Sequence, residues 1–484
     1  MSARYRRGGK EQGGRTMKRA GISWLVPLSV ALSGIASIFV WLKATATASV
    51  TLRLPDPRNV IKQELPYELA VYRNMGTLIP GEANPSEFSG SWPQFRGADR
   101  TNIVRDSLRF AGKWPEKLPV LWEIELGEGH AGTAIHNGCV YIVDYDRELE
   151  EDAIRCLSID DGNEIWRYTY QVRVKRNHGM SRTVPAVNDG FVVTLGPMCH
   201  VHCLKAETGD CAWKMDMVKD FGTEVPAWYA GQCPLIDGDR AILAPGADPL
   251  MMAVDLVTGE TVWKTPNPGG WGMTHSSIVP IEFEGKRQYV YCSTQGVVGV
   301  SADTGEILWT KPDWRISISN IPTPIPIGDG RIFLCGGHQA GAIMIRLVRE
   351  GGSIRAEELF RLKHTVFGSD QQTPILLNNH IYGVAPSGEL ACIDLFGKLM
   401  WTSGRERRFG LGPYIAADGR IFALNDQEGV LRMIEATSAG YKELGAAKVL
   451  DGHDAWAPIA LAGDRMLLRD STKMVCLSLP TEEK

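Results

Sequence analysis

One short pattern recurs along this chain and constrains its fold more than any other feature. An apolar strand leads into a glycine-containing turn, and a second apolar strand carries a tryptophan four residues after the glycine. The clearest pairs are Gly162 with Trp166, Gly209 with Trp213, Gly259 with Trp263, Gly305 with Trp309 and Gly397 with Trp401. Trp122 also fits the tryptophan position, and Phe360 and Leu444 fill it in two degenerate copies. The intervals between these eight anchors run from 41 to 51 residues, a period typical of repeat architectures.

A hairpin midway between successive anchors supports the same period. The eight hairpins begin at Thr133, Val184, Cys233, Val279, Thr323, Thr373, Gly412 and Ala457. Their Asp-Gly and Asn-Gly turns suit the positive φ angles that a tight hairpin needs. Each unit then holds four strands, and eight units occupy the 360 residues from Val120 to Leu479. We therefore predict an all-β, eight-bladed propeller with four-stranded blades, with a β-sandwich of accidental periodicity as the alternative.

Two expectations concern how the ring closes. The last unit is expected to own its four strands, the last of which ends at residues 474–477. The amino-terminal stretch 91–104 is expected to lie across an outer sheet edge, where it would cover exposed hydrogen-bonding groups.

The amino terminus predicts export. Residues 1–20 hold seven Lys or Arg and one Glu, and residues 21–42 form an uncharged run of 22 residues. Such a run can cross a bilayer as a helix, and the basic flank predicts an N-in, C-out orientation. We expect a basic cytoplasmic segment (1–20), a transmembrane signal anchor (21–42), a linker (43–90) and an extracytoplasmic propeller (91–484). A cleaved signal is the alternative, since Ala44-Thr45-Ala46 has the small-x-small form and Met17 begins a more conventional export sequence.

The charge is distributed unevenly. Residues 1–20 carry a net charge of +6 within a chain total of −4, so the remainder is acidic, with a net charge of −10. An acidic body argues against general nucleic-acid binding, because phosphates would be repelled.

The unit x-D-x-x-T-G-x-x-x-W resembles the repeat of the pyrroloquinoline quinone (PQQ) propellers. Its closest copies are residues 255–263 (DLVTGETVW) and 302–309 (ADTGEILW), and the resemblance spans residues 92–479. It implies one of two branches: quinoprotein dehydrogenases, which bind PQQ and calcium at the axis, or non-enzymatic BamB-like propellers of outer-membrane-protein assembly, which dock partners. It also implies that the tryptophans pack between blades and that the glycines permit the turns. This chain is closest in size to the second branch.

The chain departs from both branches. No two cysteines are adjacent, as they often are beside the quinone, and there is no C-x-x-C-H motif for covalent haem. The first cysteine is Cys139, so no lipidation site follows the apolar segment.

The cysteines predict packing. Cys156, Cys203, Cys392 and Cys476 occupy the same last-strand position, where other units place Ala253 or Gly299, which favours a small buried side chain. In the segment 199–203 (CHVHC), the two cysteines would lie about 13 Å apart along a strand, too far for one zinc ion or a disulfide.

The segments before the hairpins supply the candidate site. They join the first strand of each unit to the second, so all should emerge on one face near the axis, and the connections that carry His338 and Gln339 should share this face. The candidates for ligand or partner binding there are His130, His178, Arg182, Trp228, Tyr229, Trp271, His275, Asn320, Gln371, His453 and Trp456. A ring of imidazole, guanidinium, amide and indole groups suits a small polar ligand or a peptide loop. Alternatively, these residues satisfy strand ends and plug the channel.

Three functions follow. The preferred one is a membrane-anchored, non-catalytic scaffold that binds an envelope protein or peptide and needs no cofactor. The alternative is a dehydrogenase dependent on PQQ and calcium, with Asp370 or Asp454 as the base, Glu128 or Asn320 as calcium ligands, and Trp228, Trp271 or Trp456 stacked on the quinone. The third is carbohydrate binding on the Trp-lined face.

Overall fold

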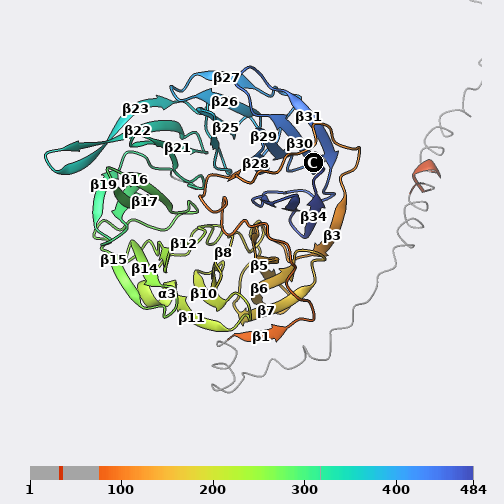
Figure 1. Cartoon of the computed structure of the whole chain (residues 1–484), viewed down its shortest axis with the longest axis horizontal. Coiled ribbons are helices and arrows are strands. Elements are labelled where there is room, and N and C mark those ends of the chain that lie inside the picture. The colour runs from red at the N-terminus through yellow and green to blue at the C-terminus, as the bar shows by residue number, and fades with distance from the viewer. Residues whose placement is uncertain (1–31, 36, 38–75, 317, 483–484) are drawn as a thin grey trace, which may run out of the picture. The chain divides into compact units, whose positions relative to one another are not determined.

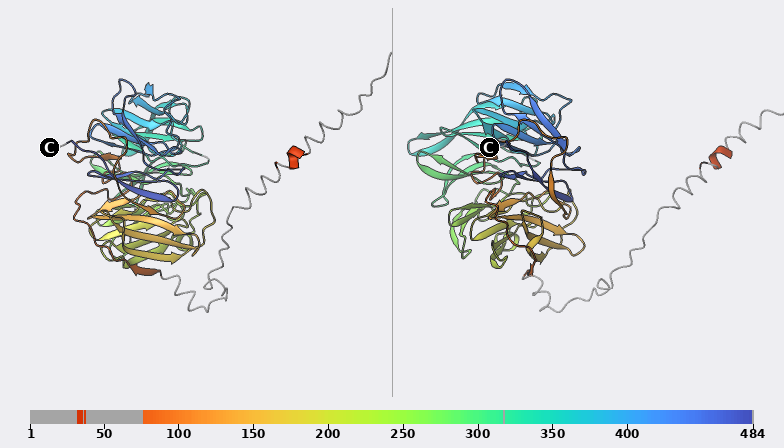
Figure 2. Two further views of the ribbon diagram at one scale, coloured as in Figure 1. Left: turned by 90° about the vertical axis from the view of Figure 1, so that its right-hand side faces the viewer. Right: turned by 45° about the vertical axis from the view of Figure 1, so that its right-hand side comes forward.

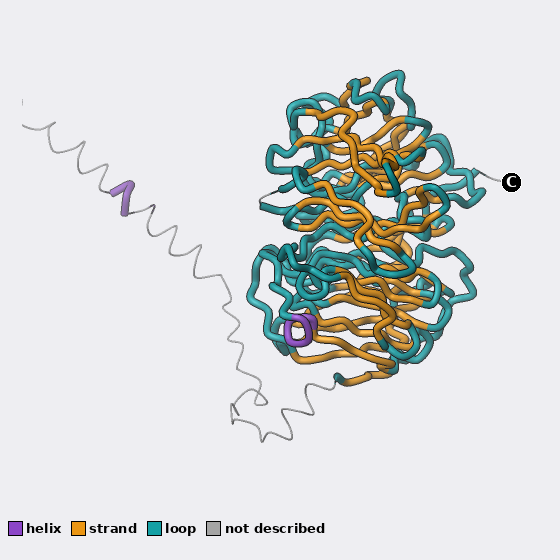
Figure 3. Tube along the Cα trace, turned by 90° about the vertical axis from the view of Figure 1, so that its left-hand side faces the viewer, coloured by secondary structure: helices purple, strands orange, loops and turns teal. Residues whose placement is uncertain are grey.

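The eight-bladed propeller is confirmed. The computed structural model describes residues 32–35, 37, 76–316 and 318–482, and the chain divides into two units, residues 1–66 and 67–484. Eight antiparallel sheets in the second unit surround a common axis (Figure 1). Seen from the side, the strands run across a thick disc (Figure 2), and the loops gather at its two faces (Figure 3).

Each blade is a four-stranded meander with its first strand nearest the axis. Blades 1 to 4 comprise β4 (Ala134–His136), β5 (Cys139–Asp146), β6 (Glu151–Ser158) and β7 (Glu164–Gln171); β8 (Ala186–Val187), β9 (Phe191–Leu195), β10 (His200–Lys205) and β11 (Cys211–Asp216); β12 (Leu235–Asp237), β13 (Arg240–Leu243), β14 (Met251–Asp255) and β15 (Thr261–Thr265); and β16 (Val279–Phe283), β17 (Lys286–Ser293), β18 (Gly296–Ser301) and β19 (Ile307–Lys311). Blades 5 to 7 comprise β20 (Ile325–Gly328), β21 (Arg331–Gly336), β22 (Gly341–Glu350) and β23 (Ser353–Leu362); β24 (Ile375–Leu377), β25 (His380–Val384), β26 (Leu390–Asp394) and β27 (Leu399–Thr402); and β28 (Tyr414–Ala417), β29 (Arg420–Leu424), β30 (Val430–Glu435) and β31 (Glu443–Lys448). A short helix, α3 (Met217–Phe221), follows blade 2.

The last blade closes the ring with a strand from the start of the fold. Blade 8 contains β32 (Ala460–Ala462), β33 (Arg465–Arg469) and β34 (Lys473–Ser478), and its outer strand is β3 (Val120–Glu125), antiparallel to β34. The expectation that the last unit owns its four strands is therefore wrong. The tryptophan strand of each repeat is the outer strand of the preceding blade, so the division of the chain into blades is shifted by one strand.

Five of the six anchor tryptophans connect their own blade to the next one, whereas the Trp309 indole N–H donates to the Gln288 side chain within blade 4. The Trp122 indole N–H donates to the Ile159 carbonyl at 2.8 Å, and Trp166, Trp213, Trp263 and Trp401 donate to the corresponding carbonyls of Ala206, Leu256, Ala302 and Thr437. Gly162 turns with φ of 74°, and a Cβ there would lie 2.8 Å from the Trp122 ring. The turn glycine therefore serves both the backbone conformation and the close approach of the neighbouring indole.

The two degenerate anchors differ. Phe360 lies opposite Met344 in register, as predicted for an anchor. The assignment of Leu444 is wrong by one residue: a bulge places Gly445 opposite Met433, at the anchor position. The ring of Trp114 lies against Gly445 and stacks on Phe422 with centroids 5.8 Å apart, so a side chain from the amino-terminal segment fills the vacant anchor site.

Opposite each anchor tryptophan lies a position that holds a small residue, and four of the cysteines occupy this position. Cys156, Cys203, Cys392 and Cys476 lie directly across from Trp166, Trp213, Trp401 and Trp122, and all four are fully buried. Gly299 holds the same position, where a Cβ would lie 2.1 Å from the Trp309 ring. The packing prediction for these cysteines is confirmed, because only a small side chain fits beneath the indole.

The stretch 91–104 lies at the inner edge of the ring, and the expectation of an outer edge is wrong. Trp92 exchanges backbone hydrogen bonds with Ile135 of blade 1, and β2 (Ile103–Val104) pairs in parallel with β28 of blade 7. Figure 1 shows this orange segment crossing the centre of the ring. An outer edge is instead covered by β1 (Thr77–Pro80), which lies within the segment predicted as a linker and pairs with β7.

Two buried arginines fasten this crossing segment, which we call the plug (residues 91–104). Arg96 donates to the carbonyls of Thr373 and Pro374 in blade 6 and to two carbonyls within the plug. Arg100 donates to the carbonyls of Cys233 and Pro234 in blade 3. Burial lowers the pKa of both guanidinium groups to about 10, so they stay charged at neutral pH.

The predicted membrane segment lies mostly outside the described residues. Residues 32–35 and 37 are helical within it. Of the helices that the structure describes, none is long and apolar enough to cross a membrane.

Replacing Trp122 should weaken ring closure. Trp122→Ala is expected to lower the free energy of unfolding by about 3–5 kcal/mol, because it creates a cavity at the junction of blades 8 and 1 and removes the bond to Ile159. Urea titration followed by circular dichroism measures this loss. Phe396→Ala, at a residue 83% exposed, is the matched control and should change little. Equal midpoints for the two variants would contradict the closing role.

Arg96 should matter to stability far more than a surface arginine. Arg96→Met is expected to cost about 2–4 kcal/mol, because the carbonyls that it serves lose their donors inside the ring. Arg105→Met, whose side chain is 64% exposed beside Asp99, is the control and should stay within about 0.5 kcal/mol. Thermal unfolding of both variants provides the comparison, and similar melting temperatures would show that the plug is not fastened by Arg96.

Candidate functional site

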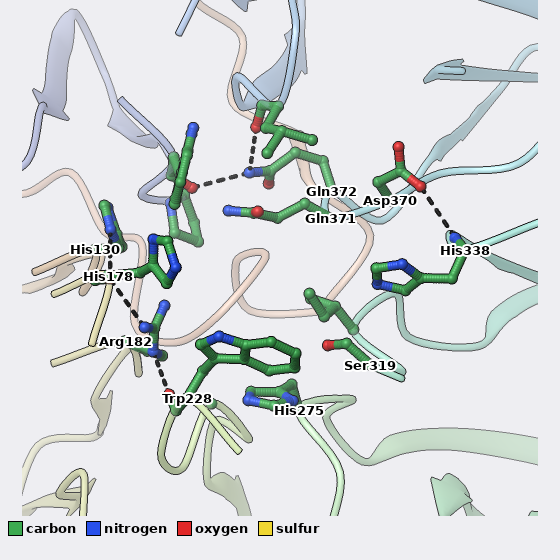
Figure 4. Close-up of a pocket in the computed structure, with 15 residues that line it drawn as sticks. His130, His178, Arg182, Trp228, His275, Ser319, His338, Asp370, Gln371 and Gln372 are labelled. Carbon is green, nitrogen blue, oxygen red and sulfur yellow. Dashed lines mark hydrogen bonds between the residues drawn. The ribbon is translucent and has the colours of Figure 1, made fainter. Parts of the chain in front are cut away.

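A cavity of about 330 Å³ opens on the axial face built by the segments that enter each blade. These segments follow the outer strand of one blade and lead into the inner strand of the next, so they converge on the axis. The residues that line the cavity are His130, His178, Arg182, Trp228, Gly231, His275, Ser319, Ile321, His338, Asp370, Gln371, Gln372, Leu411, Trp456 and Pro458 (Figure 4). Only His338 comes from a connection between second and third strands.

The structure brings seven of the eleven predicted site residues to this cavity: His130, His178, Arg182, Trp228, His275, Gln371 and Trp456. Asp370, a predicted base, also lines it. Sequence reasoning left Ile321, Leu411 and Pro458 out, because apolar residues in these segments carry no chemical signal.

The other four predicted residues lie elsewhere. Tyr229 packs against the cluster of Tyr145, Val174 and Met180, and its hydroxyl donates to the Lys175 carbonyl. Trp271 packs against the core between blades 3 and 4. Asn320 is buried outside the cavity lining, and its side chain has no hydrogen-bond partner among the described residues. His453 lines an adjoining pocket.

Arg182 is held rigidly at one wall. Its Nε donates to the Trp228 carbonyl, and its Nη2 donates to the carbonyls of Asn177 and His178 at 2.8 and 2.9 Å. Among the described residues, no carboxylate lies within 4 Å of the guanidinium and its Nη1 has no acceptor. Burial lowers the pKa of Arg182 to about 10, so the group remains a cation at neutral pH.

Two imidazoles near Arg182 are neutral at physiological pH. Burial, reinforced by the charge of Arg182, lowers the pKa of His130 to about 3 and that of His275 to about 4. His130 packs on Trp456 with ring centroids 4.6 Å apart, and its Nε2 lies 3.0 Å from the His178 carbonyl. When Nε2 donates there, Nδ1 is left as a buried acceptor without a protein partner among the described residues.

Asp370 and Gln371 supply the opposite wall and the centre. The Asp370 carboxylate accepts the backbone N–H of His338 at 3.3 Å and has no cation within 4 Å among the described residues. The Gln371 amide points into the cavity in Figure 4 and has no hydrogen-bond partner within the described chain. Gln372 is fixed instead, because its amide donates to the carbonyls of Leu411 and Trp456.

Backbone strain gathers around the cavity. The non-glycine residues His178, Trp228, Tyr229, His338 and Gln339 have φ between 51° and 72°. Such conformations are disfavoured for residues with a Cβ and persist only where the surroundings impose them. The strain fixes the orientation of side chains at the cavity wall.

The predicted calcium ligands do not come together. Glu128 lines the adjoining pocket with Asp454, and both of its carboxylate oxygens accept bonds from Arg176 at 3.0 and 2.7 Å. Asn320 is buried outside both pockets, and Asp370 is the only carboxylate among the residues that line the cavity. Calcium takes six to eight oxygen ligands, and this donor set does not fit it, although Trp228 and Trp456 offer flat surfaces.

The fold and its axial site define the class: an eight-bladed PQQ-like propeller whose centre is crossed by an amino-terminal plug. The family described as outer membrane protein assembly factor BamB matches residues 150–403, more than half of the chain. The chain belongs to this family, and the resemblance drawn from its repeats is confirmed.

Individual proteins similar to this chain include two BamB proteins and a dehydrogenase. The chain is 22% identical over 334 residues to the outer membrane protein assembly factor BamB of Moranella endobia (strain PCIT), covering 66% of this chain and 70% of that protein. The crystal structure of BamB from Moraxella catarrhalis superposes with a TM-score of 0.52 at 13% identity, over 74% of this chain and 99% of that one. A quinohemoprotein alcohol dehydrogenase from Comamonas testosteroni gives a TM-score of 0.43 at 12% identity, over 83% and 82% of the two chains.

The buried imidazoles should make the stability of the fold depend on pH. Because the folded pKa values of His130 and His275 lie below the ordinary 6.5, the unfolded chain takes up more protons, and stability should fall as pH drops from about 6.5 to about 4. His130→Asn and His275→Asn should each flatten this dependence in urea titrations. His453→Asn, at a side chain 71% exposed, is the matched control. An unchanged slope in both buried variants would refute the neutral state of these imidazoles.

Proposed function

We propose that this chain is a non-catalytic binding scaffold of the cell envelope that docks a protein or peptide partner on the face that carries the axial cavity. Membership of the BamB family supports this proposal, since the relatives are named for outer-membrane protein assembly. The partner class that follows is a protein of that assembly process. Catalysis is not needed to explain the groups that line the cavity.

The main support for the proposal is that backbone strain and polar groups without partners occur together at the wall of the axial cavity. Trp228 is held at a φ of 63°, Arg182 has no counter-ion, and the buried Nδ1 of His130 has no partner within the described chain. Each feature costs folding free energy, and such costs are typical of binding sites, where a ligand supplies the missing contacts. If these residues only filled the channel, no contact would offset the free energy that the strain and the unpaired groups cost.

The location of the scaffold follows from the amino terminus. We propose that residues 21–42 anchor the chain in the membrane with residues 1–20 in the cytoplasm and the propeller outside it. Cleavage after the apolar segment would instead release the propeller into the periplasm. In both cases the cavity faces an extracytoplasmic compartment.

The docking face can be tested by partner capture. The full-length chain, extracted in mild detergent with a carboxyl-terminal tag, should retain outer-membrane assembly proteins from an envelope extract. Trp228→Ala should weaken retention about 30-fold, which corresponds to the 2 kcal/mol expected for a central aromatic contact. Phe396→Ala removes an exposed aromatic ring from a turn between third and fourth strands, outside the cavity lining, and should bind like the wild type.

Two outcomes would overturn the proposal. Equal retention by the wild type and Trp228→Ala would show that the cavity face is not the docking surface. Reduction of a dye with simple alcohols or sugars, after the purified chain is mixed with PQQ and calcium, would show that the chain is an enzyme. The expected result of the second assay is no cofactor-dependent rate, because Glu128 and Asn320 do not come together, Glu128 is paired with Arg176, and Asp370 is the only carboxylate among the residues that line the cavity.

A further inference from the structure

The axial cavity carries one charge of each sign, and neither is neutralised by the protein. Arg182 stands at one wall and Asp370 at the other, on segments that enter blades 2 and 6 (Figure 4). No ion pair joins them, and neither has an oppositely charged side chain within 4 Å in the described part of the chain. A pair of uncompensated, partly buried charges is costly unless a ligand completes it.

The two buried imidazoles beside Arg182 add no charge to this wall. Burial keeps His130 and His275 neutral there, so the fixed positive charge is the guanidinium of Arg182. Its Nε and Nη2 are occupied by backbone carbonyls, which leaves Nη1 as a fixed, free donor. A rigid guanidinium whose Nη1 N–H groups are free suits a single carboxylate.

The Asp370 wall suits a cation. The carboxylate is pressed against the backbone of the loop that carries His338, since a Cβ on Gly337 would lie 2.3 Å from Asp370 Oδ1. Its one protein hydrogen bond among the described residues, from the His338 N–H, leaves acceptor capacity for an ammonium group.

The part of the cavity between Arg182 and Asp370 suits a backbone amide of a ligand. Gln371 projects its unpaired side-chain amide into the cavity, where it offers a donor and an acceptor at once. Trp228, Leu411 and Pro458 supply apolar surface around it. The cavity volume of about 330 Å³ lies within the range of small-ligand sites.

From this arrangement we infer that the cavity binds a short zwitterionic peptide, with its carboxylate on Arg182, its ammonium on Asp370 and a backbone amide on Gln371. The inference rests on the proposed binding function and names the ligand class of the same site. A polyanionic ligand fits poorly, because one cation would face several negative groups and Asp370 would repel them. A neutral sugar would leave both charges unpaired.

Calorimetry with alanine peptides tests the inference. The full-length chain is titrated with dialanine, trialanine and tetra-alanine with free ends, and with the N-acetylated and C-amidated form of each. We expect one length to bind best and either cap to weaken its binding at least tenfold, since each removes a charge-assisted contact.

Two variants test which terminus of the peptide each charged residue binds. In Asp370→Asn, the free and N-acetylated peptides should bind equally, while the C-amide remains weaker. In Arg182→Gln, the free and C-amidated peptides should bind equally. Asp370→Asn keeps the assignment testable if Arg182→Gln does not fold, because an amide oxygen can still accept the His338 N–H. Arg105→Gln is the surface control and should bind as the wild type does.

The outcomes separate this inference from the proposed function. Peptides that do not bind, or that bind equally with and without caps, overturn the zwitterion assignment even when partner capture persists. Sensitivity to the C-amide alone would also overturn it, and would point to the carboxyl terminus of a protein as the occupant. Peptide binding with the expected cap dependence but without any captured partner would uphold the inference and remove the protein-docking part of the proposed function.

Discussion

The ring depends on one repeated contact, in which the indole of an outer strand passes beneath the glycine turn of the next blade. The contact sets two sequence requirements at once: a residue that tolerates positive φ at the turn, and a small residue opposite the tryptophan within its own sheet. Trp122 makes this contact across the ring closure, where β3 completes blade 8 and its indole bonds to Ile159 of blade 1. The same interaction therefore joins blades 1 to 4 in sequence and also joins the two ends of the ring, at the junction of blades 8 and 1.

A closed ring of eight blades leaves an axial channel, and here the chain fills one end of it with its own plug. Arg96 and Arg100 reach blades 6 and 3, so the plug bonds across the ring rather than to one blade. Guanidinium groups suit this role because each offers several donors to the backbone carbonyls that point toward the axis. The axial cavity is lined by the segments that enter the blades and by the His338 loop.

The repeat predicted the fold because period, turn glycines and anchors all follow from local physics. It failed where a contact is made by a segment outside the repeat: Trp114 occupies the position beside Gly445 that no strand residue fills, and β3 crosses from the start of the fold to its last blade. The site was predicted by register, which placed His130, Arg182 and Trp228 on one face. Register could not separate the cavity lining from its support, so Tyr229 and Asn320 were included and Leu411 was not.

The rigidity of the ring explains how such a site can persist. In a mobile loop, strained residues such as Trp228 and an unpaired cation such as Arg182 would relax to other conformations. They would then no longer be held in the orientation that a ligand recognises. Here each entering segment is tied at both ends to the sheets of two neighbouring blades, which holds the segments of Arg182 and Asp370 in place around the cavity. Arg182 and Asp370 therefore stay without counter-ions until a ligand of complementary charge binds. A scaffold of this kind recognises by preorganisation, and its selectivity lies in the spacing of charges that the blades hold apart.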